Sequence, residues 1–176
     1  DVAGSDFYPN WGQATQYTPF DLNGDAIIQY SNLNYQGINI GSTQDLSSME
    51  FLRLDIWTAD AINIDTYLIS AGSGEKFIKT TLAKDKWTSI EIPLSAFTDQ
   101  GLSVSDIYQF KFVGSGTVFI DNIYFYKAPS GIVTSKIQDF EGAAPAFTVF
   151  GNIAATEVIT NPDRTGKNTT ANVAKL

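Results

Sequence analysis

The stretch from Thr117 to Lys127 constrains the fold of this chain more than any other. Almost all of its residues are β-branched or aromatic, with one acidic-amide pair, Asp121 and Asn122, in the middle. Such residues favour a strand, whose successive side chains point to opposite faces. Both faces of this predicted strand are mostly apolar, so we expect both to be covered. One face carries Val118, Ile120, Asn122, Tyr124 and Tyr126, and the other carries Phe119, Asp121, Ile123 and Phe125.

Asp121 needs a partner if this strand is buried, because an unpaired buried carboxylate is strongly destabilising. We expect the partner to be a cation, an Arg or Lys side chain, or backbone N–H groups. Ca²⁺ prefers carboxylate and carbonyl oxygens. Asp121 is therefore the candidate calcium ligand, and pairing with N–H groups or a Lys is the alternative.

Short strands separated by turn residues fill the chain up to about residue 127. Strands are predicted near 15–22, 26–31, 32–40 with a break at Gly37, 50–58, 62–70, 77–82, 87–92, 108–113 and 117–127. Asn23-Gly24 is a strong hairpin signal, and a helical turn is expected only near 95–98. The pattern predicts an all-β fold, an antiparallel two-sheet β-sandwich, rather than a barrel or an α/β fold.

Composition excludes several classes of function. The formal net charge is −8 without a basic cluster, which argues against nucleic acid as a partner because phosphates would be repelled. The chain has no His, the commonest general base and transition-metal ligand, and no Cys for disulfides or thiolate metal sites. No apolar run approaches the roughly 18–20 residues of a membrane span, so we expect no membrane insertion.

The amino-acid composition of the sequence changes after the predicted sandwich, residues 1–127. Residues 128–136 open with Ala-Pro-Ser-Gly and have the composition of a linker. Residues 137–142 are typical of a new first strand, and residues 161–168 of a turn-rich loop. Residues 137–176 are too few for an independent core. We expect them to be either the truncated start of a second β module or a tail that docks on a sheet edge.

Two rows of polar and aromatic side chains form the main candidate site. The first row is Arg53, Asp55 and Trp57, the second is Asn63, Asp65 and Tyr67 on the next predicted strand, and Gln109 and Lys111 could extend them. If the two strands are neighbours, the rows form one patch. Sugar recognition needs this mixture, because aromatic rings cover the apolar side of a sugar and charged or amide groups bridge its hydroxyls. The alternative is a solvated face with weak Arg–Asp pairs.

Aromatic residues on loops form the second candidate site. Tyr8, Trp11 and Tyr35 could hold the end of a sugar chain at one end of the sandwich. The alternative is that Trp11 caps the open end of the core. We assign four other aromatic residues to the core: Trp87, Tyr108, Phe110 and Phe112.

Four segments carry a resemblance to a known family: Asn34–Gly37, Phe51–Thr58, Trp87–Phe97 and Phe119–Phe125. On the basis of these segments, residues 4–127 resemble the accessory β-sandwich modules in secreted polysaccharide-degrading enzymes of marine Bacteroidota, such as laminarinases. These modules have a jelly-roll, galactose-binding-like fold. Residues 4–127 are more remotely similar to carbohydrate-binding modules of families four, eleven and twenty-two. The resemblance implies polysaccharide binding, a secreted or cell-surface location, a catalytic domain in the same parent chain, and often a structural Ca²⁺ ion.

The resemblance has two further implications. Asp6 would accompany Asp121 as a calcium ligand. In the family another strand precedes the loop at Asn10–Gln13, so we expect the first strand of the module to be absent from this sequence.

We expect no catalysis by this chain. Glycoside hydrolysis needs two carboxylates about 5–10 Å apart, and Asp55 with Asp65 could meet that distance only by accident. The sequence therefore predicts a non-catalytic carbohydrate-binding module that attaches a parent glycoside hydrolase to a polysaccharide, with a β-glucan such as laminarin favoured. The alternative is a structural spacer or interaction module of a large secreted or cell-surface protein.

Overall fold

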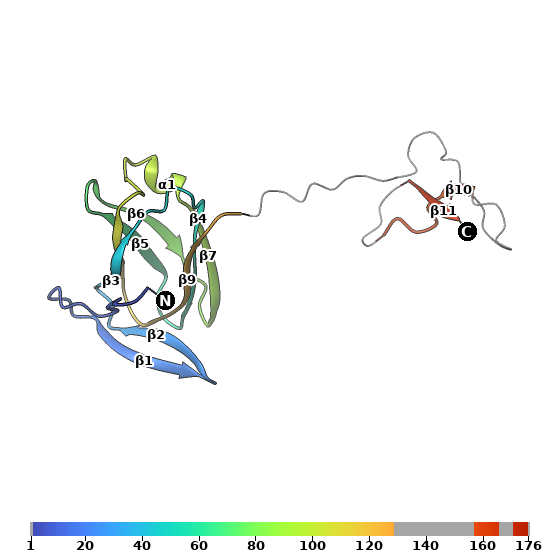
Figure 1. Cartoon of the computed structure of the whole chain (residues 1–176). Coiled ribbons are helices and arrows are strands. Elements are labelled where there is room, and N and C mark those ends of the chain that lie inside the picture. Colours follow the sequence, from blue (N-terminus) through green and yellow to red (C-terminus); the bar gives the residue numbers. More distant parts are fainter. Residues whose placement is uncertain (1, 129–156, 166–170, 176) are drawn as a thin grey trace. The chain divides into compact units, whose positions relative to one another are not determined.

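The computed structural model describes residues 2–128, 157–165 and 171–175. It divides the chain into two compact units, Asp1–Pro129 and Ser130–Leu176 (Figure 1). Among the described residues the only helix is α1 (Ser95–Thr98), which is too short to cross a membrane.

The first unit is built from two antiparallel sheets. The five-stranded sheet has the order β1-β2-β9-β4-β7, and the four-stranded sheet has the order β3-β8-β5-β6. The strands of the first sheet are β1 (Gln16–Leu22), β2 (Asp25–Ser31), β9 (Val118–Tyr126), β4 (Phe51–Thr58) and β7 (Lys86–Pro93). Those of the second are β3 (Tyr35–Gln44), β8 (Ile107–Gly114), β5 (Asn63–Ser70) and β6 (Gly74–Thr81).

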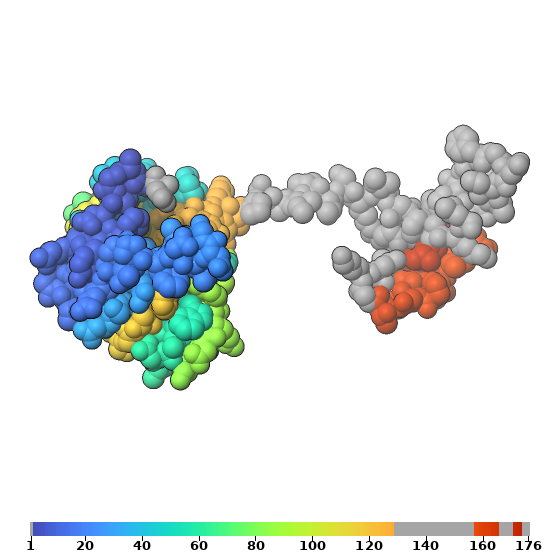
Figure 2. All heavy atoms as spheres, turned by 90° about the horizontal axis from the view of Figure 1, so that it is seen from below, coloured from blue at the N-terminus to red at the C-terminus, as the bar shows by residue number. Residues whose placement is uncertain are grey.

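The β1–β2 hairpin confirms the turn signal in the sequence. Asn23 and Gly24 both have positive φ, 57° and 93°, as a two-residue hairpin turn requires. The hairpin projects from the rest of its sheet (Figure 1), and residues up to about 30, in blue, cover much of that end of the unit (Figure 2).

The core lies between the two sheets. Every second residue of β4 is buried, and burial alternates in the same way in β5 up to Leu68 and in β8 from Gln109 to Val113. The fully buried side chains include Leu52, Leu54, Ile56, Ile64, Leu68 and Phe112. Burying a side chain of this size contributes about 1.5–3 kcal/mol. The predicted all-β antiparallel sandwich is thus confirmed.

β9 corrects the predicted faces of the closing strand. Arg53 of β4 pairs with Tyr124, whereas Asp55 pairs with Asp121, so β9 carries an extra residue between these pairs. Asn122 has a φ of 54° at this bulge, and an extra residue reverses the alternation beyond it. The core side therefore carries Val118 and Ile120 before the bulge, but Ile123 and Phe125 after it.

β3 and β6 are longer than the sequence indicates. β3 runs unbroken through Gly37, and β6 begins at Gly74, because it pairs with β5 from the turn onward. The helical turn at Ser95–Thr98 is confirmed.

The second unit contains one described strand pair. β10 (Glu157–Thr160) and β11 (Asn172–Lys175) pair antiparallel. Asp163 accepts the N–H of Thr165 at 2.8 Å, as a turn residue does. The predicted strand at 137–142 and the predicted linker beyond residue 128 lie outside the described residues.

Candidate functional site

The two predicted rows of site residues lie on different sheets. β4, with the first row, pairs with β7 and β9, whereas β5, with the second row, pairs with β6 and β8. The prediction of one joint patch is therefore wrong, because the chain crosses from one sheet to the other after Thr58. The core also separates Asp55 from Asp65, so they do not form a pair across one glycosidic bond. We call the outer surface of β3-β8-β5-β6 the four-strand face, and that of the other sheet the five-strand face.

The four-strand face and its border carry most of the predicted binding residues. They are Asp65 and Tyr67 on β5, Gln109 and Lys111 on β8, Tyr35 on β3, and Trp11 in the loop before β1. The pairing register of the strands brings these residues together, because Lys111 of β8 lies opposite Tyr67 of β5 on one side and opposite Gly37 of β3 on the other. A hollow of about 740 Å³ lies over this part of the sheet, lined by Trp11, Tyr35, Glu75, Tyr108, Gln109 and Lys111 among others.

Trp11 is positioned by a glycine and by main-chain hydrogen bonds. A Cβ atom on Gly37 would lie 2.3 Å from Cη2 of the indole, so only glycine lets the ring lie there. The Tyr35 hydroxyl donates to the Trp11 carbonyl at 2.9 Å, and the Trp11 N–H donates to Oε1 of Gln13 at 2.7 Å. Gln13 also donates to the buried side chain of Gln36 at 3.0 Å. Trp11 therefore lines the outer hollow and does not cap the core.

Tyr67 is held between neighbours on both adjacent strands. The ring of Phe77 stacks on it with centroids 4.8 Å apart, and Nζ of Lys111 lies 4.0 Å from its centroid on the other side. Both ring faces of Tyr67 are thus covered. Of the two stacked rings, Phe77 is the one exposed to solvent, with 40% of its surface accessible.

The charges on the four-strand face come in pairs. Nζ of Lys111 lies 2.5 Å from a carboxylate oxygen of Glu75, and Nζ of Lys79 lies 3.4 Å from Asp65. Burial, followed by the charges of Asp65 and Glu75, raises the pKa of Tyr67, so its hydroxyl stays protonated. Gln109 donates to Oδ1 of Asn39 at 2.6 Å across β8 and β3.

On the five-strand face, Asp55 is the centre of a polar cluster. Nη2 of Arg53 lies 3.2 Å from its Oδ1, and Nδ2 of Asn122 donates to its Oδ2 at 3.0 Å. Burial alone would raise the pKa of Asp55, but hydrogen bonds from Ser89, Asn122 and Arg53, with the Arg53 charge, hold the pKa below its ordinary value. Asp55 is therefore ionised at neutral pH.

The aromatic residues of this face differ from the prediction. Trp57 packs edge-on against Phe119, with centroids 5.4 Å apart, and lies opposite Trp87 in register. Trp87 is 41% exposed, so its assignment to the core is wrong, because it points outward from the edge strand β7. Phe110 and Phe112 are confirmed as core, whereas Tyr108 is half-buried and lines the hollow on the four-strand face.

The predicted calcium ligands lie in separate settings. Oδ1 of Asp121 accepts the N–H of Asn122 at 2.7 Å, which is one of the expected partners. Asp6 accepts the N–H of Tyr8 and bridges to Asn39, in the other sheet. Within residues 2–128, 157–165 and 171–175, no group of three or more Asp, Glu, His or Cys side chains is arranged to hold a metal ion. A Ca²⁺ ion at Asp121 would depend largely on other oxygen ligands, and it stays a prediction.

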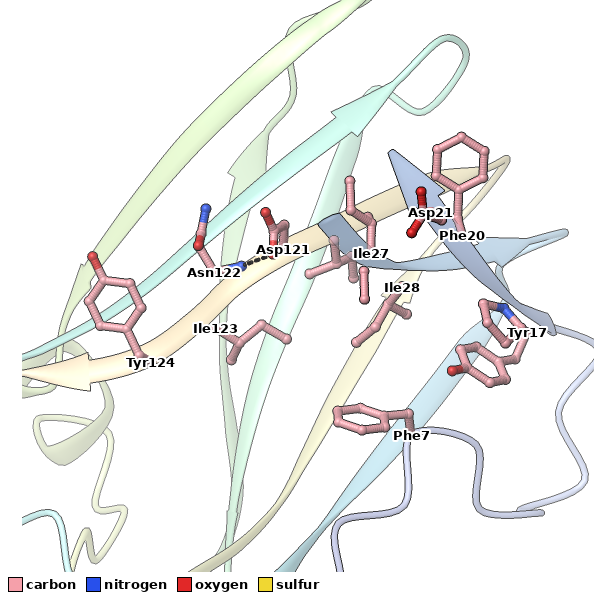
Figure 3. A pocket seen from close by; sticks show the side chains of 13 residues that line it. Phe7, Tyr17, Phe20, Asp21, Ile27, Ile28, Asp121, Asn122, Ile123 and Tyr124 are labelled. Atoms are coloured by element: carbon pink, nitrogen blue, oxygen red, sulfur yellow. Dashed lines mark hydrogen bonds between the residues drawn. The ribbon is translucent and has the colours of Figure 1, made fainter. Parts of the chain in front are cut away.

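Another hollow, of about 590 Å³, opens where β2 separates from β9 (Figure 3). β2 pairs with β9 only over Ile28–Tyr30. The hollow beyond is lined largely by apolar side chains such as Phe7, Ile28 and Ile123, with Asp121 and Asn122 at one side (Figure 3). Because these apolar residues also pack against the core, we attribute the hollow to the diverging strands.

Four residues near the two faces escaped the sequence prediction: Glu75, Phe77, Tyr108 and Trp87. A turn centred on residue 72 would already place Phe77 opposite Tyr67, so a hairpin register drawn from the sequence could have found it. The outward position of Trp87 follows from alternation along β7, because Ile90 and Ile92 lie on the opposite, buried side of the strand.

Comparisons with known proteins identify solved structures that share the fold of this chain. No protein-family model matches the chain, and no curated protein matches it. It is similar to the family 11 carbohydrate-binding module from Clostridium thermocellum in complex with a β-1,3-1,4-mixed-linked tetrasaccharide, with a TM-score of 0.53 and 19% identity over 73% of this chain and 91% of that chain. It is also similar to the family 11 module of the cellulosomal cellulase Lic26A-Cel5E of the same organism, with a TM-score of 0.50 and 20% identity over 73% and 90%.

The first unit thus has the β-sandwich fold of a carbohydrate-binding module. A family 29 carbohydrate-binding module matches with a TM-score of 0.49 and 14% identity, over 69% of this chain and 79% of that chain.

Proposed function

We propose that the first unit is a non-catalytic carbohydrate-binding module whose four-strand face binds a polysaccharide. The observation that carries this proposal is the hollow beside Trp11, where an indole, the Gln109 amide and the Lys111–Glu75 ion pair converge. An aromatic ring packs against the C–H side of a sugar, and amide and charged groups bond to its hydroxyls. The fold similarity to the family 11 modules supports the proposal.

The charges of this face favour a neutral polysaccharide. Within the described part of the chain, Lys111 on this face is paired with Glu75, and Lys79 is paired with Asp65. Little positive charge is left to attract uronates or sulfates. Among neutral polymers a β-glucan such as laminarin is favoured, which rests on the resemblance to accessory modules of laminarinases.

The biological role we propose is attachment of a parent glycoside hydrolase, secreted or at the cell surface, to its substrate. Holding the catalytic domain on the polymer raises its effective concentration there. Each single contact should be weak, because stacking on one or two rings leaves little free energy after the ordering costs of binding.

Trp11→Ala tests the proposal directly. The hydrogen bonds of Trp11 use its main-chain N–H and carbonyl, so the substitution removes the indole and leaves those bonds in place. In a native gel containing laminarin, we expect Trp11→Ala to lose affinity about tenfold or more, equivalent to about 1.4 kcal/mol.

Tyr124→Ala is the matched control, because Tyr124 is 49% exposed and lies in β9 of the other sheet. It should migrate like the wild type. Equal retardation of wild type and Trp11→Ala would contradict the assignment of the hollow.

A further inference from the structure

The five-strand face contains two adjoining hollows that the proposed site does not use. One, of about 320 Å³, is lined by Phe20, Leu22, Ile27, Trp57, Trp87 and Phe119 and is almost wholly apolar. The other, of about 280 Å³, shares Leu22, Ile27 and Trp87 with it and is otherwise polar. Its polar lining is Asp25, Asp55, Ser89, Asp121 and Asn122. Trp87 therefore lies on the border between an apolar and a polar surface.

The apolar hollow is shaped by an aromatic cluster. The β1–β2 hairpin brings Phe20 edge-on to Phe119 with centroids 5.1 Å apart, and Trp57 packs on Phe119 from β4 at 5.4 Å. This packing leaves Trp87 at the rim with 41% of its surface exposed. Exposing so much of a large aromatic side chain beside other apolar residues is typical of binding surfaces.

The polar hollow offers hydrogen-bond acceptors and an amide. Asp55 and Asp121 lie directly opposite each other in register, although like charges so placed destabilise a sheet. Arg53 and Asn122 both contact Asp55, and the bulge at Asn122 brings its amide to this position. The polar groups thus gather beside the exposed ring of Trp87.

We propose that this surface is a second sugar site, which takes one pyranose ring of a neutral polysaccharide. The C–H side of the sugar lies on Trp87, and its hydroxyls bond to Asp55, Asp121 and Asn122. Sugars match this surface because they combine an apolar face with a hydroxyl-bearing edge. The carboxylates at the polar end repel uronates and sulfated sugars, so the ligand is uncharged.

The second site extends the proposed function and rests on it, since both sites take the same class of ligand. The two sites lie on the outer surfaces of opposite sheets. One module therefore contacts two polysaccharide chains, or two turns of one chain, and gains avidity from the second contact.

The three Trp residues of the chain report the two sites separately. Trp11 belongs to the four-strand hollow, and Trp57 and Trp87 belong to the five-strand face. The experiment is a titration of the ¹⁵N-labelled full chain with a β-1,3-1,4-mixed-linked tetrasaccharide and with laminarihexaose, following the indole N–H signals. Single Trp→Phe substitutions assign the signals.

We expect the signals of both Trp11 and Trp87 to shift. Asp121→Asn should reduce the shift at Trp87 several-fold and leave that at Trp11 unchanged, and Tyr124→Ala should alter neither. A shift at Trp11 without one at Trp87 overturns the second site and leaves the proposed function standing. No shift at any indole overturns both. A response of Trp87 to a Lys-rich peptide, but to neither sugar, overturns the sugar site in favour of a basic protein partner.

Discussion

Replacing Gly37 with Ala tests whether Trp11 is held against β3 as the structure places it. The new Cβ would lie 2.3 Å from Cη2 and 2.4 Å from Cζ3 of the indole. Carbon atoms in ordinary contact are about 3.5–4.0 Å apart, so the ring has to retreat by more than about 1 Å or leave the sheet. Overpacking of this kind costs about 1–3 kcal/mol.

The same substitution has the opposite effect once the ring is gone. In a Trp11→Ala background the clash disappears, and Ala is better than Gly in a strand interior by about 0.5–1 kcal/mol. We therefore expect Gly37→Ala to destabilise the wild type and to stabilise the Trp11→Ala protein slightly.

Urea unfolding of the four proteins in this double-mutant cycle measures the coupling between the two positions. The expected coupling free energy is about 1–3 kcal/mol, the cost of the clash alone, because the strand preference of Ala over Gly is present in both backgrounds and cancels. An equal change in unfolding free energy in both backgrounds would refute the packing of Trp11 on Gly37. Gly37→Ala should also weaken retardation by laminarin, because it displaces the same ring.

Two further predictions concern carboxylates. Hydrogen bonds from the Ser70 hydroxyl and the Gly72 N–H, at 2.6 and 2.7 Å, lower the pKa of Asp106 from its ordinary 3.8 although burial opposes this. Ionised Asp106 therefore stabilises the fold above its unfolded pKa, and this stability is lost as the pH falls through the lower folded pKa. Asp106→Asn should lower the urea midpoint at pH 7, and its difference from the wild type should shrink as the pH falls below the ordinary pKa of 3.8. A difference of the same size at neutral and at acid pH would disprove the assignment. If Asp121 holds Ca²⁺, excess Ca²⁺ should raise the thermal midpoint over that in chelator by mass action, and Asp121→Asn should abolish the response. An identical melt in Ca²⁺ and chelator would dismiss the ion.

The fold was predictable because burial alternates so regularly along single strands. Phe51–Thr58 and Asn63–Ser70 each show one apolar side in the sequence, and each buries that side. Such local alternation predicts strands and a two-layer core. It does not say which strands pair, because a short connection can form a hairpin or cross to the other sheet. This is why the prediction that Arg53–Trp57 and Asn63–Tyr67 form one joint patch was wrong.

The faces of β9 were not predictable from the sequence, whereas the outward side of Trp87 was. The bulge at Asn122 adds one residue against β4, and it becomes visible only when the partner strand is known. Asn tolerates positive φ better than most residues, which is a weak signal in a sequence. Trp87 shares its side of β7 with the exposed Ser89 and Glu91, opposite the buried Ile90 and Ile92, so alternation within this one strand already indicates its outward position. The bulge in β9, by contrast, depends on contacts between residues far apart in the chain.

Retardation of the full chain in native gels containing different polysaccharides tests the central claim most directly. The panel consists of laminarin, mixed-linkage β-glucan, starch, xylan, agarose and alginate. We predict that a neutral polymer, laminarin first among them, retards the wild type, that Trp11→Ala reduces this effect, and that anionic alginate has none. Unchanged migration in every gel would contradict the account and favour a structural spacer or interaction module.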